Sequence, residues 1–137
     1  VKPSAGQRNT RSCGLASRTL EYLLRYRSRD DERLLDLTPH MHLRGKSFRY
    51  DVTFPDGRKD TLLNVPNYDF NWQLKYILDE PVLLPKGTVV TCTAVFDNSE
   101  SNLTNPDPTK PVRWGDQSFE EMMIGFLSTV PVADEWE

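Results

Sequence analysis

The sequence predicts an all-β protein, an antiparallel β-sandwich or jelly roll that follows a basic N-terminal arm. Short runs that alternate between apolar and polar residues are separated by turn signals, which is the pattern of half-buried strands. Ten prolines against seven glycines, together with fourteen aromatic residues, are more typical of a loop-rich β protein than of a helical bundle. A chain of 137 residues suits one domain, and no apolar run approaches the ~20 residues of a membrane span.

The beginning of the chain differs from the rest in charge, and we expect an arm at residues 1–32 and a domain at residues 33–137. The first 30 residues hold seven basic and two acidic side chains, which gives +5, whereas the remaining 107 residues carry −8. The leucines within residues 15–29 fall near helical spacing and favour a short amphipathic helix, although the tyrosines there would also suit a strand. The arm lacks interleaved aromatic residues, so we expect it to contact an acidic protein surface rather than nucleic acid.

The body carries six strand patterns. A Pro-Asp-Gly turn joins the second and third patterns into a hairpin. Pro39 lies inside the first pattern and predicts an edge or a bulge there. The last pattern is apolar on both faces, which predicts a central strand, and a polar stretch of twenty residues that precedes it predicts a functional or mobile loop. In chain order the patterns cover residues 33–43, 47–54, 58–65, 72–78, 88–96 and 119–130.

The two cysteines do not define a redox compartment. Cys13 lies in the arm and Cys92 in an apolar run, so a disulfide between them is compatible with the sequence but not required by it. No apolar segment follows the early basic residues, so no signal peptide is visible. The chain begins at Val1 rather than at a methionine, as a fragment of a longer protein would.

The only two histidines of the chain, His40 and His42, stand two residues apart. On a strand, residues with this spacing point to the same face, so both imidazoles can reach one ion. Two histidines are too few for a closed metal site, and an exposed strand with two solvated histidines is the alternative. A standard cupin site is excluded, because the chain has no third histidine and no Glu three or four residues further on. We expect Cys92 in the core rather than on a metal.

Three motifs together resemble the C-terminal domain of the copper type II, ascorbate-dependent monooxygenases, the family of peptidylglycine α-hydroxylating monooxygenase and dopamine β-hydroxylase. They are TPHMHLRGK at residues 38–46, GTVVTCT at residues 87–93 and EEM at residues 120–122. The likeness spans about residues 34–130 of the chain. Each motif alone is common, but their order and spacing together are more specific.

The resemblance implies an antiparallel jelly-roll β-sandwich that binds one copper per chain through His40, His42 and Met122. In the family the ligand methionine follows an acidic pair, which selects Met122 over Met123; without the family, both methionines would be expected in the core. Soft thioether sulfur suits Cu(I), and imidazole binds both oxidation states. The resemblance further implies hydroxylation of a C–H bond with O2 and an external reductant such as ascorbate, in an extracytoplasmic (periplasmic or secreted) compartment.

The chain also departs from the family. The family's enzymes hold a second copper through three histidines of a separate N-terminal domain, which this chain lacks, so the second electron must come from another domain or protein. The family's disulfide partner of Cys92 falls at Met123, so that disulfide is absent. The helical-looking segment replaces a family strand near residues 15–30, which would leave an open sheet edge and favours a homodimer.

Other polar groups near the motifs have simpler expected roles. Arg44 and Lys46 are expected in solvent, and the cluster around Asp69 and Trp72 is expected to shape a loop. Asp116 is a candidate acceptor for a hydrogen bond from one histidine. The alternative function, from a different class, is a non-catalytic module that binds copper or a partner; a third interpretation is a sandwich with a vacant site that serves association alone.

Overall fold

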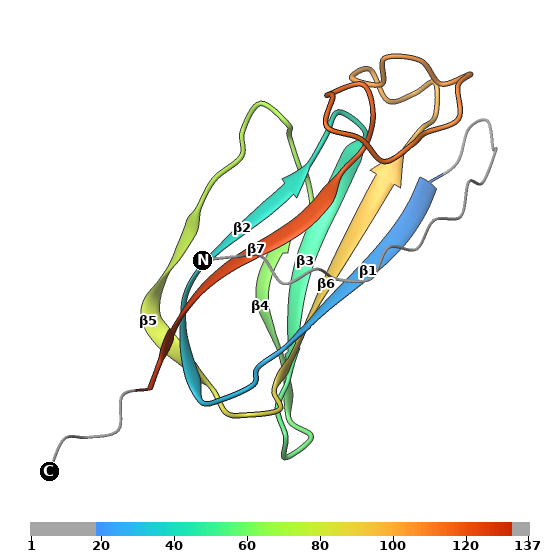
Figure 1. Cartoon of the computed structure of the whole chain (residues 1–137). Helices are drawn as coiled ribbons and strands as arrows, with labels where there is room; N and C mark the ends of the chain where they lie inside the picture. The colour runs from blue at the N-terminus through green and yellow to red at the C-terminus, as the bar shows by residue number, and fades with distance from the viewer. Residues whose placement is uncertain (1–18, 133–137) are drawn as a thin grey trace, which may run out of the picture.

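The computed structural model describes residues 19–132, and this part of the chain forms seven β-strands and no helix. The all-β prediction is therefore confirmed. The strands pair antiparallel in two sheets, one of order β1-β6-β3-β4 and one of order β5-β2-β7 (Figure 1). Their bounds are β1 Thr19–Arg27, β2 Glu32–Met41, β3 Gly45–Thr53, β4 Lys59–Val65, β5 Tyr76–Leu84, β6 Val89–Asp97 and β7 Met123–Pro131.

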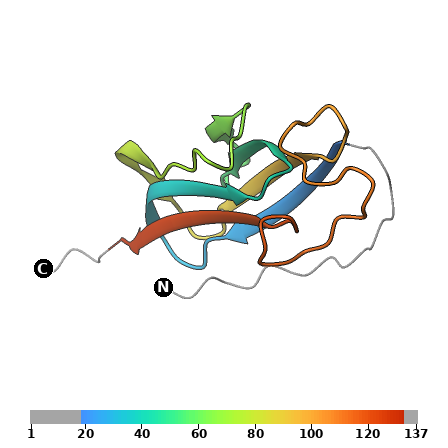
Figure 2. The same ribbon diagram turned by 90° about the horizontal axis from the view of Figure 1, so that it is seen from above.

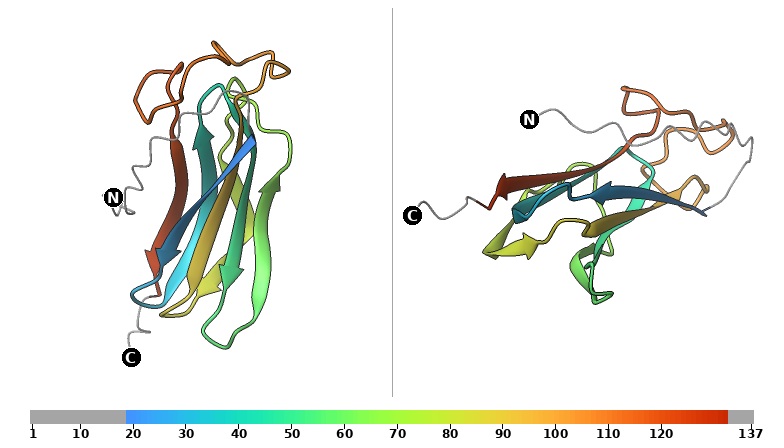
Figure 3. Two further views of the ribbon diagram at one scale, coloured as in Figure 1. Left: turned by 90° about the vertical axis from the view of Figure 1, so that its right-hand side faces the viewer. Right: turned by 60° about the horizontal axis from the view of Figure 1, so that its bottom comes forward.

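The two sheets pack face to face as layers, as Figures 2 and 3 show from three directions. β7 lies over β6, because a Cβ added to Gly125 in β7 would stand 2.5 Å from the thiol sulfur of Cys92 in β6. The hydroxyl of Tyr50 in β3 donates a hydrogen bond of 3.2 Å to the backbone oxygen of Phe126 in β7, across the same interface. Since β1 is the next strand beyond β6, it extends past the edge of the three-stranded sheet.

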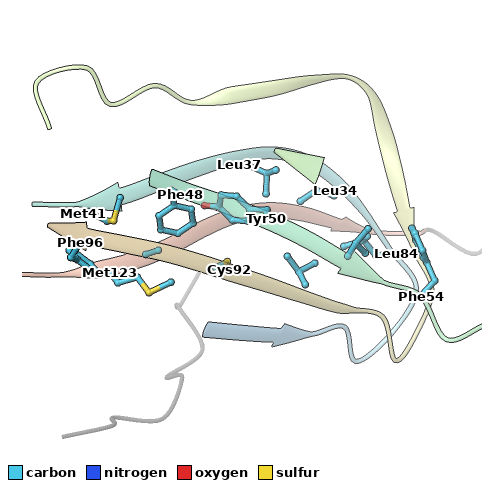
Figure 4. Packing of buried hydrophobic residues seen from close by; sticks show 13 residues of the cluster. Leu34, Leu37, Met41, Phe48, Tyr50, Phe54, Leu84, Cys92, Phe96 and Met123 are labelled. Atoms are coloured by element: carbon cyan, nitrogen blue, oxygen red, sulfur yellow. The ribbon is translucent and has the colours of Figure 1, made fainter. Parts of the chain in front are cut away.

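The period of two along each strand places one face of both sheets in a single core (Figure 4). In β6 every second residue from Val90 to Phe96 is buried, and in β3 the buried side chains are those of Phe48, Tyr50 and Val52. Burying one such large apolar side chain stabilises the fold by roughly 1.5–3 kcal/mol. The remaining apolar members of the core are Leu34, Leu37, Met41, Phe54, Leu84, Cys92, Ala94 and Met123.

The helix expected within residues 15–29 is wrong where the structure describes it, because residues 19–27 form β1. All nine residues of β1 pair with β6, and this long ladder outweighs the helical spacing of the leucines. Leu24 faces the core opposite Cys92, so the strand alternative suggested by the tyrosines is the correct one. Residues 1–18 of the predicted arm, Cys13 included, lie outside the described residues, and Cys92 carries a free thiol.

Two further strand predictions need correction. The pattern at residues 72–78 becomes a strand only from Tyr76, because the chain leaves a turn at Trp72, whose N–H donates to the Asp69 carbonyl at 3.0 Å, and stays irregular until residue 75. β7 begins at Met123 and is an edge strand of the described sheet, whereas the central strand is β2. The apolar outer face of β7 is therefore partly in water, with Phe126 43% exposed.

β2 is paired on one side only at its C-terminal end. Its pairing with β5 ends at Leu37, while its pairing with β7 continues to Met41. Pro39 therefore lies where β2 is locally an edge, as the sequence predicted, and the bulge of this strand falls earlier, between Leu34 and Asp36. The hydroxyl of Tyr68 takes the place of a strand there, since it accepts from the Met41 N–H at 2.9 Å and donates to the Met41 carbonyl at 2.8 Å.

Close contact between the sheets at Gly125 gives a direct test of this packing. We expect Gly125→Ala to lower the free energy of unfolding by about 1–3 kcal/mol, because the new methyl group overlaps the Cys92 sulfur. The double variant Gly125→Ala, Cys92→Ala should lose less than the sum of the two single variants, as measured by urea denaturation. Additive losses would show that the two residues do not meet across the sandwich.

Candidate metal site

His40 and His42 lie at the C-terminal end of β2, beside the start of β7. Met41 between them is fully buried in the core, so the two imidazoles point away from the core on the outer face of the sheet. The ring centroids are 5.2 Å apart and the ring planes are 85° to each other. His42 is nonetheless only 5% exposed, because the surrounding loops cover it, while His40 is half-buried.

Hydrogen bonds orient both rings and select one tautomer of each. Nδ1 of His40 lies 2.6 Å from the Oε1 atom of Gln73, and Nδ1 of His42 lies 3.3 Å from the carbonyl oxygen of Glu120. Gln73 donates its amide to the Phe70 carbonyl at 2.8 Å, so its oxygen is the atom turned toward His40. Both partners are acceptors, so each neutral ring carries its proton on Nδ1 and keeps a lone pair on Nε2. This pattern of acceptors on the second nitrogen is common for metal-binding histidines.

Met122 lies next to the histidines by strand register. Met41 pairs with Met123, and the same register carried one residue further places Met122 opposite His42. Met123 is 7% exposed and belongs to the core, so strand alternation continued to Met122 would direct its side chain to the outer face. By this extrapolated register, the three residues chosen from the motifs belong to the same end of the sheet.

The buried carboxylate of Glu121 joins the strand ends that carry these residues. Its two oxygens accept hydrogen bonds from the backbone N–H of His42 at 3.1 Å and of Arg44 at 2.7 Å. Burial raises the pKa of the Glu121 carboxyl, while the backbone donors and the Arg44 guanidinium oppose the shift. The backbone of Glu121 is itself fixed, since its N–H donates to the carbonyl of Arg113 at 2.9 Å.

Arg44 is buried, with 3% of its side chain exposed, and the expectation that it lies in solvent is wrong. Its Nε donates to the Asn98 side chain at 2.8 Å, and its Nη1 donates to the Phe119 carbonyl at 2.8 Å. Burial lowers the pKa of the guanidinium, and the nearby Glu121 carboxylate acts in the opposite direction. Arg44 therefore holds the loop before β7 in place. Lys46 has an exposed side chain, as expected, with an ion pair of 3.7 Å to Asp97.

The segment between β4 and β5 covers one side of the histidine pair. The ring of Phe70 lies 5.9 Å from that of His42, at 87° between planes. Asp69 shapes this segment, as the sequence predicted, because its carboxylate accepts from the Asn71 N–H at 2.8 Å. The histidine acceptor role proposed for Asp116 is filled instead by Gln73 and by a backbone carbonyl. Gln73 had no signal in the sequence, because its role depends on the fold of this loop.

The long loop at residues 98–122 lies at the same end of the sandwich (Figure 1). Successive Asx turns organise it, in which the side chain of Asn102, Asn105 or Asp107 accepts from the backbone N–H two residues later, at 2.9–3.2 Å. At its C-terminal end, Trp114 forms an isolated bridge with Glu121, which supports the predicted anchoring role of residues 114–116.

Within residues 19–132, no three His, Cys, Asp or Glu side chains form a group that could hold a metal ion. A three-ligand site at the histidine pair therefore needs a ligand of another type, and Met122 is the candidate that follows from the register of β2 with β7. Nor does this part of the chain contain a helix long and apolar enough to cross a membrane. No model of a known protein family matches the chain, and no curated protein matches it significantly.

Removal of the Glu121 carboxylate should test its role between the strand ends. We expect Glu121→Ala to lower the free energy of unfolding by about 2–4 kcal/mol, because two buried N–H groups lose their acceptor and a buried guanidinium loses its counter-ion. The matched control is Glu120→Ala, whose carboxylate accepts only an exposed hydrogen bond from Gln117; it should cost less than about 1 kcal/mol. Similar losses in urea denaturation of both variants would contradict this role.

Proposed function

We propose that this chain is a copper-binding domain of the type found in the copper type II, ascorbate-dependent monooxygenases, with His40, His42 and Met122 as ligands. The observation that carries the proposal is the state of the two imidazoles. Both Nδ1 atoms are occupied by acceptors, both Nε2 lone pairs remain, and the rings stand 5.2 Å apart on one face. Two imidazoles and one thioether suit copper better than a hard cation, because the thioether favours Cu(I).

The proposal includes the jelly-roll form of the sandwich, and the strand order supports it. The chain passes from one sheet to the other at every connection except the β3–β4 hairpin. This order matches that of an eight-stranded jelly roll without its first strand, whose place would be beside β7 and opposite β1. Tyr22 of β1 agrees with such a gap, because it points to the inner side of its sheet and is still 45% exposed.

Bound at this site, copper would supply the activation of O2 for insertion of oxygen into a C–H bond, with electrons from an external reductant such as ascorbate. The residues of this chain would orient the ligands: Gln73 and the Glu120 carbonyl fix the rings, and Glu121 fixes the backbone of His42. Phe70 and the loops limit the access of water to His42. An extracytoplasmic location belongs to the same proposal.

A non-catalytic copper- or partner-binding module is the second candidate. It is favoured by the histidine count, because both histidines of the chain are in the proposed site and none remains for a second copper. The catalytic reading therefore requires an electron-transfer domain or protein in addition to this chain. A third possibility is a sandwich with a vacant site that functions only in association, and the absence of bound copper in a Cu(I) competition experiment would identify it.

Copper binding should depend on Met122 much more than on Met123. We expect the chain to bind about one Cu(I), and Met122→Leu to weaken the binding of Cu(I) by tenfold or more because it removes the soft ligand. Met123→Leu is the matched control, since it replaces a core thioether by a side chain of similar volume. Competition with a Cu(I) chelator measures both affinities. Equal effects would contradict the ligand assignment, and the absence of copper binding would leave only an association module.

Turnover should separate the two functional classes. Because the chain has no third histidine for a second copper of the family's type, we expect little or no uptake of O2 with ascorbate and a candidate substrate when this chain is alone. An oxygen electrode measures the rate, and His42→Ala provides the background. Rapid hydroxylation that His42→Ala abolishes would show that the chain is a complete enzyme, and the module reading would then be wrong.

A further inference from the structure

β1 is the outer strand of the four-stranded sheet, and within residues 19–132 it pairs only with β6. The side chains of Leu20 and Leu24 stand opposite Phe96 and Cys92 and face the inner side of the sheet. The odd-numbered residues of the strand therefore face outward. In chain order these outward residues are Thr19, Glu21, Leu23, Arg25 and Arg27.

The outward residues of one β1 strand are complementary to those of a second β1 strand that runs antiparallel to it. An antiparallel pair of two β1 strands has one register that pairs all nine residues, and its two-fold axis passes through the central residue, Leu23. In that register Leu23 stands opposite Leu23 of the second copy, and Glu21 stands opposite Arg25 of the second copy. The symmetry repeats the Glu–Arg pair, and opposite charges at facing positions stabilise a sheet. Leu23 is 53% exposed in the single chain and would be covered at the centre.

We propose that two copies of this chain associate through the free edge of β1, antiparallel about a two-fold axis at Leu23, and so form one continuous eight-stranded sheet. Charged residues on a sheet edge normally prevent such pairing. Here the order of the charges reverses that effect, because Glu21 and Arg25 meet each other in the full-length register. Arg27 faces Thr19, so no like charges stand opposite each other. The histidine pair lies on the outer face of the other sheet, so this association does not involve it.

The other edges of the described sheets fit a second copy less well. In β5, the same full-length pairing would place Glu80 opposite Glu80 of the second copy, next to Pro81, which cannot donate a ladder hydrogen bond. In β4, Asp60 would meet an asparagine and Lys59 a valine, so no charge is matched. In β7 the edge is uncharged, but β1 extends over the space beside it, so a second copy paired there would overlap β1.

Charge reversal tests the register. Sedimentation equilibrium of the full chain should show a dimer, and Glu21→Arg or Arg25→Glu should each weaken dimerisation by about tenfold or more, because each creates two facing like-charge pairs. The double variant Glu21→Arg, Arg25→Glu should restore dimerisation. Lys59→Glu, at the opposite edge of the same sheet, is the control and should change nothing. A monomeric wild-type chain, or single variants that the double variant does not rescue, would overturn the proposal.

A cysteine at the two-fold axis gives an independent readout. Facing residues of an antiparallel pair have Cα atoms ~4.5–5.5 Å apart, within the range of a disulfide. In a Cys13→Ser background, where the remaining Cys92 is buried, Leu23→Cys should form a covalent dimer on mild oxidation. Arg25→Cys should not, because the two copies of residue 25 would lie ~13 Å apart along the strands. Equal crosslinking at the two positions would contradict the register and with it the proposed surface.

Discussion

The arrangement at the end of the sandwich depends on one buried carboxylate. Glu121 precedes β7, and it accepts hydrogen bonds from the backbone on both sides of Leu43, just after β2 ends. Sheet pairing alone brings β2 and β7 together as far as Met41 and Met123. Beyond these two residues the Glu121 carboxylate links the two chain segments, and it also lies 3.9 Å from the guanidinium of Arg44. A satisfied polar network of this kind specifies one geometry, because every alternative would leave a buried donor without an acceptor.

The parts of the fold that local sequence determines were predictable. The Pro-Asp-Gly turn and the clean alternation around it predicted the β3–β4 hairpin within two residues, because both signals act between neighbours in the chain. β1 was not predictable in the same way. Its leucines fit a helical spacing, whereas only Leu20 and Leu24 fit one face of a strand, and the ladder with β6, about seventy residues away, decides for the strand.

The same distinction applies to the candidate site. The shared face of His40 and His42 follows from strand geometry, so the sequence alone predicts it. The burial of Arg44 could not be predicted from its neighbours, because the acceptors that make it tolerable are Asn98, Glu121 and a backbone carbonyl of a distant loop. Gln73 is a similar case, since its amide becomes an acceptor for His40 only when the loop between β4 and β5 folds back over β2.

His42 and Glu121 are 79 positions apart along the chain, and this separation affects the order in which the parts of the fold form. The β3–β4 hairpin closes a short loop, whereas the pairing of β2 with β7 closes a long one and costs more chain entropy, which favours its late formation. The two imidazoles are neighbours in the unfolded chain already, but the thioether joins them only when β7 docks. A cation that needs imidazole alone therefore binds the unfolded and the native state and shifts the folding equilibrium little. A cation that also needs the sulfur binds the native state selectively and stabilises it.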